Sequence, residues 1–170
     1  MSLNRRVATE RRTRMTITSL AVAAVARGAI LAGSIGQAAA HDPSVRTIRV
    51  AARATNINDF VDIGPAGPSP GDVYVFVEDL LTADLTRVIG KAEGRCNLID
   101  PQAGRFECTT VNTLPNGTIT TDGVLVNVTG ATSVGAVTGG TGHFRAVKGE
   151  ADVVLGEPQG PHQVTFRLTS

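Results

Sequence analysis

The sequence predicts an all-β domain that follows an N-terminal signal peptide. After residue 40, no segment has the apolar spacing of an amphipathic helix. Short apolar or alternating runs are instead separated by clusters of Gly, Pro, Asn and Asp, which is the pattern of strands and turns. Eight such runs in about 130 residues suit a small up-and-down barrel or a sandwich.

Residues 1–40 have the three parts of a secretory signal peptide. Arginines are frequent over residues 5–14, an apolar run covers Thr16–Gly36, and Ala38–Ala40 offers a cleavage motif. Arg27 interrupts the apolar run, which argues against a stable membrane span. A disordered or amphipathic tail is the alternative, and the export route (general secretory or twin-arginine) stays open. We expect a signal peptide over 1–40 and a secreted or extracytoplasmic domain over 41–170.

Charge and histidine spacing exclude two classes of function. Residues 41–170 contain 10 basic and 14 acidic residues, which gives a net charge of −4. An acidic domain without a basic run does not suggest nucleic acid or an anionic membrane as a partner. The three histidines are scattered, without the spacing of metal ligands, so we expect no metal site.

The strands and turns can be placed from alternation and turn residues. Asn116-Gly117 is a strong hairpin signal. The Pro- and Gly-rich stretch Gly64–Gly71 is expected to cross one end of the barrel, where it could act as a lid. We expect strands near residues 45–55, 72–80, 86–99, 105–113, 118–129, 132–138, 147–155 and 163–169.

The two cysteines are expected to face each other across a hairpin. Asp100–Gly104 is a turn signal, and pairing Ile99 with Arg105 places Cys96 opposite Cys108. An even number of cysteines in an exported chain favours a disulfide, here Cys96–Cys108; two buried free thiols are the alternative.

The hairpin register also assigns faces. Cys96, Leu98, Phe106 and Cys108 share an apolar face, which we expect to point inward. Val73–Leu80 is apolar on both faces, so its outer face could contact a second subunit. The interior of an eight-stranded barrel is either filled by side chains or holds one small ligand.

Four glycines and an aromatic residue stand out in Gly139–Glu150. A glycine-rich loop can bind phosphate when a helix follows it, but a strand-like run follows here. We therefore expect a structural turn.

This segment resembles a signature of the barrel family that includes allene oxide cyclases and plant dirigent proteins. The resemblance implies an eight-stranded antiparallel up-and-down β-barrel with an apolar cavity, no metal or cofactor, and assembly as a homodimer or homotrimer. It extends over other pieces of the chain, namely Gly71–Phe76, Val88–Gly90, Gly94–Cys96, Gly104–Glu107, Gly123 and Val164–Leu168.

The resemblance also implies a set of cavity residues. Glu78 lies where the plant cyclases carry an asparagine, and Leu125 where they carry a tyrosine; residues 48–56 lack an evident counterpart of their glutamate. Glu78 is the candidate catalytic acid, which burial beside Phe76 would favour. The candidate ligand-binding residues are Tyr74, Phe76, Cys96, Leu98, Phe106 and Leu125.

Three functions are compatible with these features. The first is a cyclase or isomerase that folds a small hydrophobic molecule and steers its cyclisation or coupling, because holding one conformer lowers the entropic part of the barrier. The second is a carrier that binds such a molecule without reaction. The third is a structural exported barrel.

Overall fold

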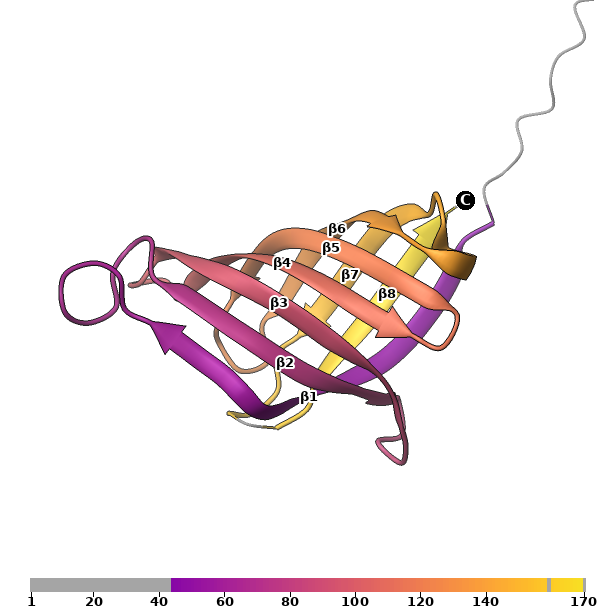
Figure 1. Cartoon of the computed structure of the whole chain (residues 1–170), viewed down its shortest axis with the longest axis horizontal. Helices are drawn as coiled ribbons and strands as arrows, with labels where there is room; N and C mark the ends of the chain where they lie inside the picture. The colour runs from indigo at the N-terminus through magenta and orange to yellow at the C-terminus, as the bar shows by residue number, and fades with distance from the viewer. Residues whose placement is uncertain (1–43, 159, 170) are drawn as a thin grey trace, which may run out of the picture. The chain divides into compact units, whose positions relative to one another are not determined.

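The computed structural model describes residues 44–158 and 160–169, which form a closed barrel of eight antiparallel strands in sequence order (Figure 1). This confirms the all-β up-and-down barrel. The predicted signal peptide over 1–40 lies outside the described residues. Among those described, no helix is long and apolar enough to cross a membrane. The elements are β1 (Arg46–Val61), β2 (Val73–Thr82), β3 (Val88–Asp100), β4 (Arg105–Leu114), β5 (Gly117–Val126), β6 (Thr132–Gly140), the short 3₁₀ helix η1 (Gly142–Phe144), β7 (Lys148–Val154) and β8 (His162–Thr169).

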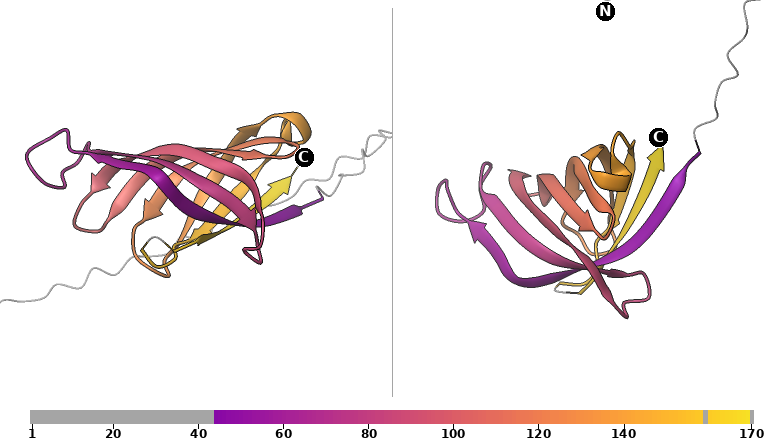
Figure 2. Two further views of the ribbon diagram at one scale, coloured as in Figure 1. Left: turned by 60° about the horizontal axis from the view of Figure 1, so that its bottom comes forward. Right: turned by 45° about the vertical axis from the view of Figure 1, so that its right-hand side comes forward.

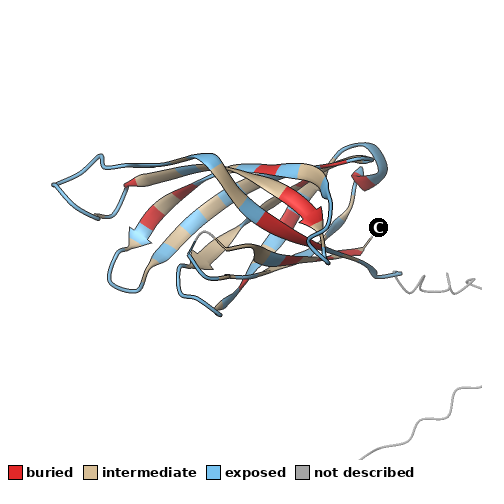
Figure 3. Ribbon diagram, turned by 90° about the horizontal axis from the view of Figure 1, so that it is seen from below, coloured by how far each residue is buried: buried red, intermediate tan, exposed pale blue. Residues whose placement is uncertain are grey.

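Alternating burial along the strands separates the interior of the barrel from its surface (Figure 3). In β8, Val164, Phe166 and Leu168 are buried, while the residues between them are partly exposed. Side chains of a strand alternate between the two faces of a sheet, so the buried residues are those that point into the barrel. Pairing of β8 with β1 over Arg46–Ala52 removes the free edges that these two strands would present in an open sheet.

One end of the barrel is sealed by a packed core. Leu80, Ile119 and Phe166 are fully buried there, and Phe144 of η1 is 3 % exposed. The β4–β5 turn, η1 and the C-terminal end of β8 lie at this end, opposite the loop after β1 (Figure 1).

The glycine-rich segment Gly139–Glu150 forms the plug of that sealed end. Gly142 has φ +60°, and a Cβ there would lie 2.3 Å from the carbonyl oxygen of Asn116, so only glycine fits the turn. The turn inserts Phe144 into the core, and the Arg46 guanidinium lies 5.5 Å from the Phe144 ring centroid. The element after η1 is strand β7 rather than a helix, so the segment is a structural turn, as predicted.

Closure of the barrel is incomplete along the seam between β1 and β8. These strands pair from Arg46 opposite Leu168 to Ala52 opposite His162. Beyond an irregularity between Ala54 and Asn58, β1 pairs with β2 alone. Figure 2 shows this second half of β1 running with β2, away from β8.

Two predicted strand ends are wrong. Strand β1 continues to Val61 rather than ending near 55, because Thr55 bridges the irregular stretch. The Thr55 hydroxyl donates to the Val77 carbonyl at 2.6 Å, and the Thr55 carbonyl accepts from the side-chain amide of Asn58 at 2.6 Å. Strand β5 ends at Val126 rather than 129, since the Asn127 amide donates to the Gly104 carbonyl instead of a strand partner.

The loop that connects β1 to β2, residues 62–72, is held by a buried carboxylate. The Asp72 side chain accepts hydrogen bonds from the backbone amides of Ile63 (2.9 Å), Gly64 (3.3 Å) and Ser69 (2.6 Å). The residue is fully buried. Hydrogen bonds from Ile63 and then Ser69 lower the pKa of Asp72 below 3.8. The loop is thus anchored to the barrel rather than free to act as a loose lid.

This anchor makes loop order sensitive to acid. Because the pKa of Asp72 is lowered on folding, the carboxylate stabilises the folded state above pH about 3.8, and that contribution is lost as pH falls through the lowered pKa. Asp72→Asn should therefore lower the free energy of unfolding near neutral pH, with the difference from wild type shrinking below pH about 3.8. Denaturant titrations across pH would measure this, with exposed Asp59→Asn as the control. A difference that grows toward low pH would contradict the assignment.

Candidate functional site

The half of the barrel away from the sealed end encloses a cavity of about 1190 Å³. Phe166, Val164 and Ala151 form its floor, where the packed core begins. Residues Leu155–Pro158, together with Asn127 and Thr129, line it at the opposite end. A volume of this size can enclose most of a small organic molecule.

Small side chains create this space. Ala54 of β1 and Ala92 of β3 lie directly opposite Glu78 of β2, and Ala52 lies opposite His162 of β8. All three alanines line the cavity. Larger residues at these positions would fill the interior, as Leu80 and Ile119 do nearer the sealed end.

The structure brings most of the sequence-predicted residues together and separates one. Tyr74, Phe76, Glu78, Cys96, Phe106 and Leu125 all line the cavity. Leu98 does not: it lines a smaller adjoining pocket with Pro68 and Pro101. The reason is that the loop after β1 covers this end of β3, with the Gly71 amide donating to the Leu98 carbonyl at 2.8 Å. The roles of these residues toward a ligand stay predictions.

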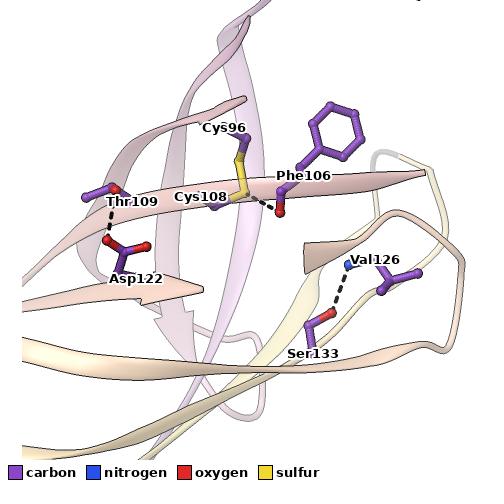
Figure 4. The surroundings of a disulfide bond; sticks show 7 residues. All are labelled: Cys96, Phe106, Cys108, Thr109, Asp122, Val126 and Ser133. Carbon is purple, nitrogen blue, oxygen red and sulfur yellow. Dashed lines mark hydrogen bonds between the residues drawn. A yellow bond between two sulfur atoms is a disulfide. The ribbon is translucent and has the colours of Figure 1, made fainter. Parts of the chain in front are cut away.

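The predicted disulfide between Cys96 and Cys108 is confirmed (Figure 4). The two residues are directly opposed on β3 and β4, with Cα atoms 4.0 Å apart, and both line the cavity. The bridge therefore forms part of the cavity wall, and neither sulfur is a free thiol.

The register next to the turn differs from the prediction. Asp100, not Ile99, pairs with Arg105, so Ile99 is the extra residue of a bulge. The Asp100 carboxylate causes this by accepting hydrogen bonds from the amides of Gln102 (3.1 Å) and Ala103 (3.0 Å), which tightens the turn. The pairings of Leu98 with Phe106 and of Cys96 with Cys108 are unaffected.

A carboxylate–imidazole pair lies in the cavity wall. Glu78 Oε1 is 3.5 Å from His162 Nε2, and the side chains are only 13 % and 19 % exposed. His162 Nδ1 accepts a hydrogen bond from the Gly156 amide at 3.2 Å. Sequence reasoning missed His162, although its spacing of two and four residues before the apolar Val164 and Phe166 places it on the inward face of β8.

Aromatic and amide groups complete the lining. The rings of Tyr74 and Phe76 stack with centroids 5.8 Å apart. Burial, and then the negative charge of Glu78, raises the pKa of Tyr74 above 10.0, so its hydroxyl remains protonated at neutral pH. Asn58 Oδ1 is buried without a hydrogen-bond partner, while the amide nitrogen of Asn58 donates to the Thr55 carbonyl. Among the described residues, no group of three or more His, Cys, Asp or Glu could hold a metal ion.

Comparison with known proteins agrees with this architecture. The family model described as allene oxide cyclase barrel like domain matches residues 49–168. The chain belongs to the allene oxide cyclase barrel-like family. No curated protein matches the sequence.

Solved structures of other barrels share the fold. A pyocyanin demethylase is 25 % identical with a TM-score of 0.62, and the match covers 73 % of this chain and 100 % of that one. A pterocarpan synthase dirigent protein is 18 % identical with a TM-score of 0.60, covering 74 % of this chain and 94 % of that one. An exo-specific intermolecular Diels-Alderase is 18 % identical with a TM-score of 0.54, covering 75 % and 99 %. Barrels of this fold thus occur in proteins with different named activities.

The disulfide of this allene oxide cyclase-like barrel should protect it from unfolding. Replacing both cysteines (Cys96→Ala with Cys108→Ala) opens a loop with a sequence separation of 12, and should lower the free energy of unfolding by up to about 3 kcal/mol. Chemical denaturation measures this loss, and reduction of the wild type should reproduce most of it. Thiol titration of denatured, unreduced protein recovered from outside the cytoplasm should find no free thiol; two free thiols would overturn the assignment.

Proposed function

We propose that this chain is an exported barrel that binds a small hydrophobic molecule in its cavity and steers the cyclisation or coupling of that molecule. The observation that carries the proposal is the cavity itself: about 1190 Å³ of space with aromatic walls and a carboxylate. An interior that served stability alone would be packed throughout, as the sealed end is.

The cavity supports a mechanism that needs little chemistry from the protein. Walls formed by Phe76, Phe106 and Leu125 would hold a flexible apolar substrate in one folded conformer. Restricting the substrate in this way removes part of the entropic barrier before reaction. Glu78 is the proposed catalytic residue: of the two carboxylates that line the cavity, its side chain is only 13 % exposed, whereas Glu157 is exposed, and it could exchange a proton with the substrate.

The similar structures give context for this proposal. A pterocarpan synthase dirigent protein and an exo-specific intermolecular Diels-Alderase share this barrel, but those chains are each 18 % identical to this one. Their likeness therefore concerns the fold. The pyocyanin demethylase, at 25 % identity, adds a barrel whose name refers to a small molecule.

Export and assembly are further parts of the proposal. The basic and apolar leader over residues 1–40 and the cavity disulfide both favour an extracytoplasmic location. Val73, Val75 and Val77 share the outer face of β2, where Val75 is 39 % exposed, and we propose this valine-rich face as the contact of a homodimer or homotrimer.

Intact-mass analysis of the exported protein tests the leader assignment. The mature chain should begin near His41, after removal of residues 1–40. A species that retains residues 20–35 would contradict export through cleavage of a signal peptide.

Binding of a neutral apolar dye such as Nile red tests the cavity. We expect saturable binding with one site per chain, and Phe106→Ala should weaken it about tenfold, because the aromatic wall is lost. The exposed Arg145→Ala is the matched control. With an identified substrate, Glu78→Gln should lower turnover while dye binding persists, because the amide retains the shape of the carboxyl group but cannot exchange a proton. If Glu78→Gln turns the substrate over as fast as the wild type does, the shape of the cavity alone promotes the reaction. If the wild type binds small molecules but turns none of them over, the protein is a carrier.

A further inference from the structure

The fold determines which nitrogen of His162 carries a proton. Nδ1 accepts the Gly156 amide hydrogen, so a neutral ring must carry its own hydrogen on Nε2. Nε2 is the nitrogen that lies 3.5 Å from Glu78 Oε1. This separation exceeds a normal hydrogen bond by a few tenths of an ångström, and such contacts commonly shorten when a ligand closes the site.

The turn between β7 and β8 is built to supply that amide. A Cβ on Gly156 would lie 2.3 Å from the carbonyl oxygen of Pro161, so only glycine permits this close turn. A proton on Nδ1 would face the Gly156 N–H, which would leave two donors opposite each other. The turn therefore retains His162 as an Nε2–H donor, with Nε2 3.5 Å from Glu78 Oε1.

We propose that His162 is a positioning residue that holds one oxygen of Glu78, so that the other oxygen accepts a proton from a ligand O–H or N–H group. The proposed ligand is thus a flat, apolar molecule that carries such a donor and no negative charge. This inference rests on the cavity function proposed above and specifies its substrate class and its proton acceptor.

The polar lining of the cavity supports a donor-bearing ligand. Asn58 Oδ1 is a second acceptor, buried and without a partner, and it lies on the same cavity wall as Glu78, on the strand beside β2. A ligand donor would satisfy either group, and a buried acceptor without a partner is costly.

The charge of the lining argues against an anionic ligand. Glu78 and Glu157 are acidic, whereas Arg53, the basic residue besides His162 among the lining residues, is half exposed and lies 3.7 Å from Asp79. A carboxylate in this cavity would be desolvated without a counter-ion. The aromatic rings of Tyr74, Phe76 and Phe106 favour a planar apolar body.

The proton step is balanced within the pair and the ligand. The ligand O–H or N–H bond breaks, its electron pair remains on the ligand atom, and the proton moves to the free oxygen of Glu78. His162 keeps its own proton and donates a hydrogen bond to the other oxygen. No oxidant or co-reactant is required, and the resulting electron-rich ligand is the species that would cyclise or couple.

A series of naphthalenes tests the ligand class on the wild-type protein. The rings are the same, while the substituent is a hydroxyl (2-naphthol), a methyl ether (2-methoxynaphthalene) or a carboxylate (2-naphthoate). We expect 2-naphthol to bind about tenfold or more tightly than the methyl ether, because it alone donates to a charged acceptor. The naphthoate should bind more weakly than either neutral compound.

The emission of bound 2-naphthol tests the acceptor and the positioning residue. The excited naphthol is a strong acid, so it should transfer its proton to Glu78 and emit as naphtholate. Glu78→Gln should abolish this emission while 2-methoxynaphthalene still binds. His162→Phe, which retains a ring but removes the N–H, should reduce it about fivefold or more, and His162→Gln, which can again donate an N–H, should restore most of it. Arg145→Ala is the surface control.

The outcomes separate this inference from the function on which it rests. If all three naphthalenes bind equally, or naphtholate emission persists in Glu78→Gln, the cavity still binds small molecules but the inference is wrong. If His162→Phe emits as wild type does, His162 has no positioning role. If no naphthalene and no Nile red binds, both proposals fail. The wild-type affinity series stands even if a variant does not fold.

Discussion

Backbone hydrogen bonding between β1 and β8 decides which part of the barrel interior is packed and which part is a cavity, because these strands pair along only about half of β1. Over Arg46–Ala52 the two strands satisfy each other's amides and carbonyls, and the enclosed interior is narrow enough to be packed solid. Beyond Ala52, β1 follows β2 away from β8, and the interior widens into the cavity. A barrel closed along its whole length would leave less room at this end for a ligand.

The same seam also fixes the position of the Glu78–His162 pair. His162, the first residue of β8, pairs with Ala52, the last residue of β1 that pairs with β8. Glu78 lies on β2 opposite Ala54, just past the end of that pairing. Both side chains therefore lie at the level where the packed core ends and the cavity begins. Here they are shielded from bulk water, yet small neighbours leave space in front of them. Proton exchange with an apolar ligand is most effective at such a boundary, where the groups are ordered and mostly dry.

Local signals explain what could be predicted. The Cys96–Cys108 bridge follows from a turn and two short runs, since contacts across a hairpin depend on few residues. The inward face of Phe76 and Phe106 follows from strict alternation. Alternation fails where an extra residue enters a strand. The bulge at Ile99 and the irregularity after Ala54 each depend on side-chain hydrogen bonds, from Asp100 and Thr55, that apolar patterning does not register.

The sequence by itself determined the all-β class, the hairpin disulfide, the glycine-rich turn over Gly139–Glu150 and the family, because these depend on local turn chemistry, alternation and a shared pattern of short motifs. Only the tertiary structure decided that His162 meets Glu78, that Leu98 lies outside the cavity, and that the loop over residues 62–72 is anchored by Asp72. The physical reason is closure: β1 lies between β2 and β8, so residues far apart in the chain become neighbours only once the last strand pairs with the first.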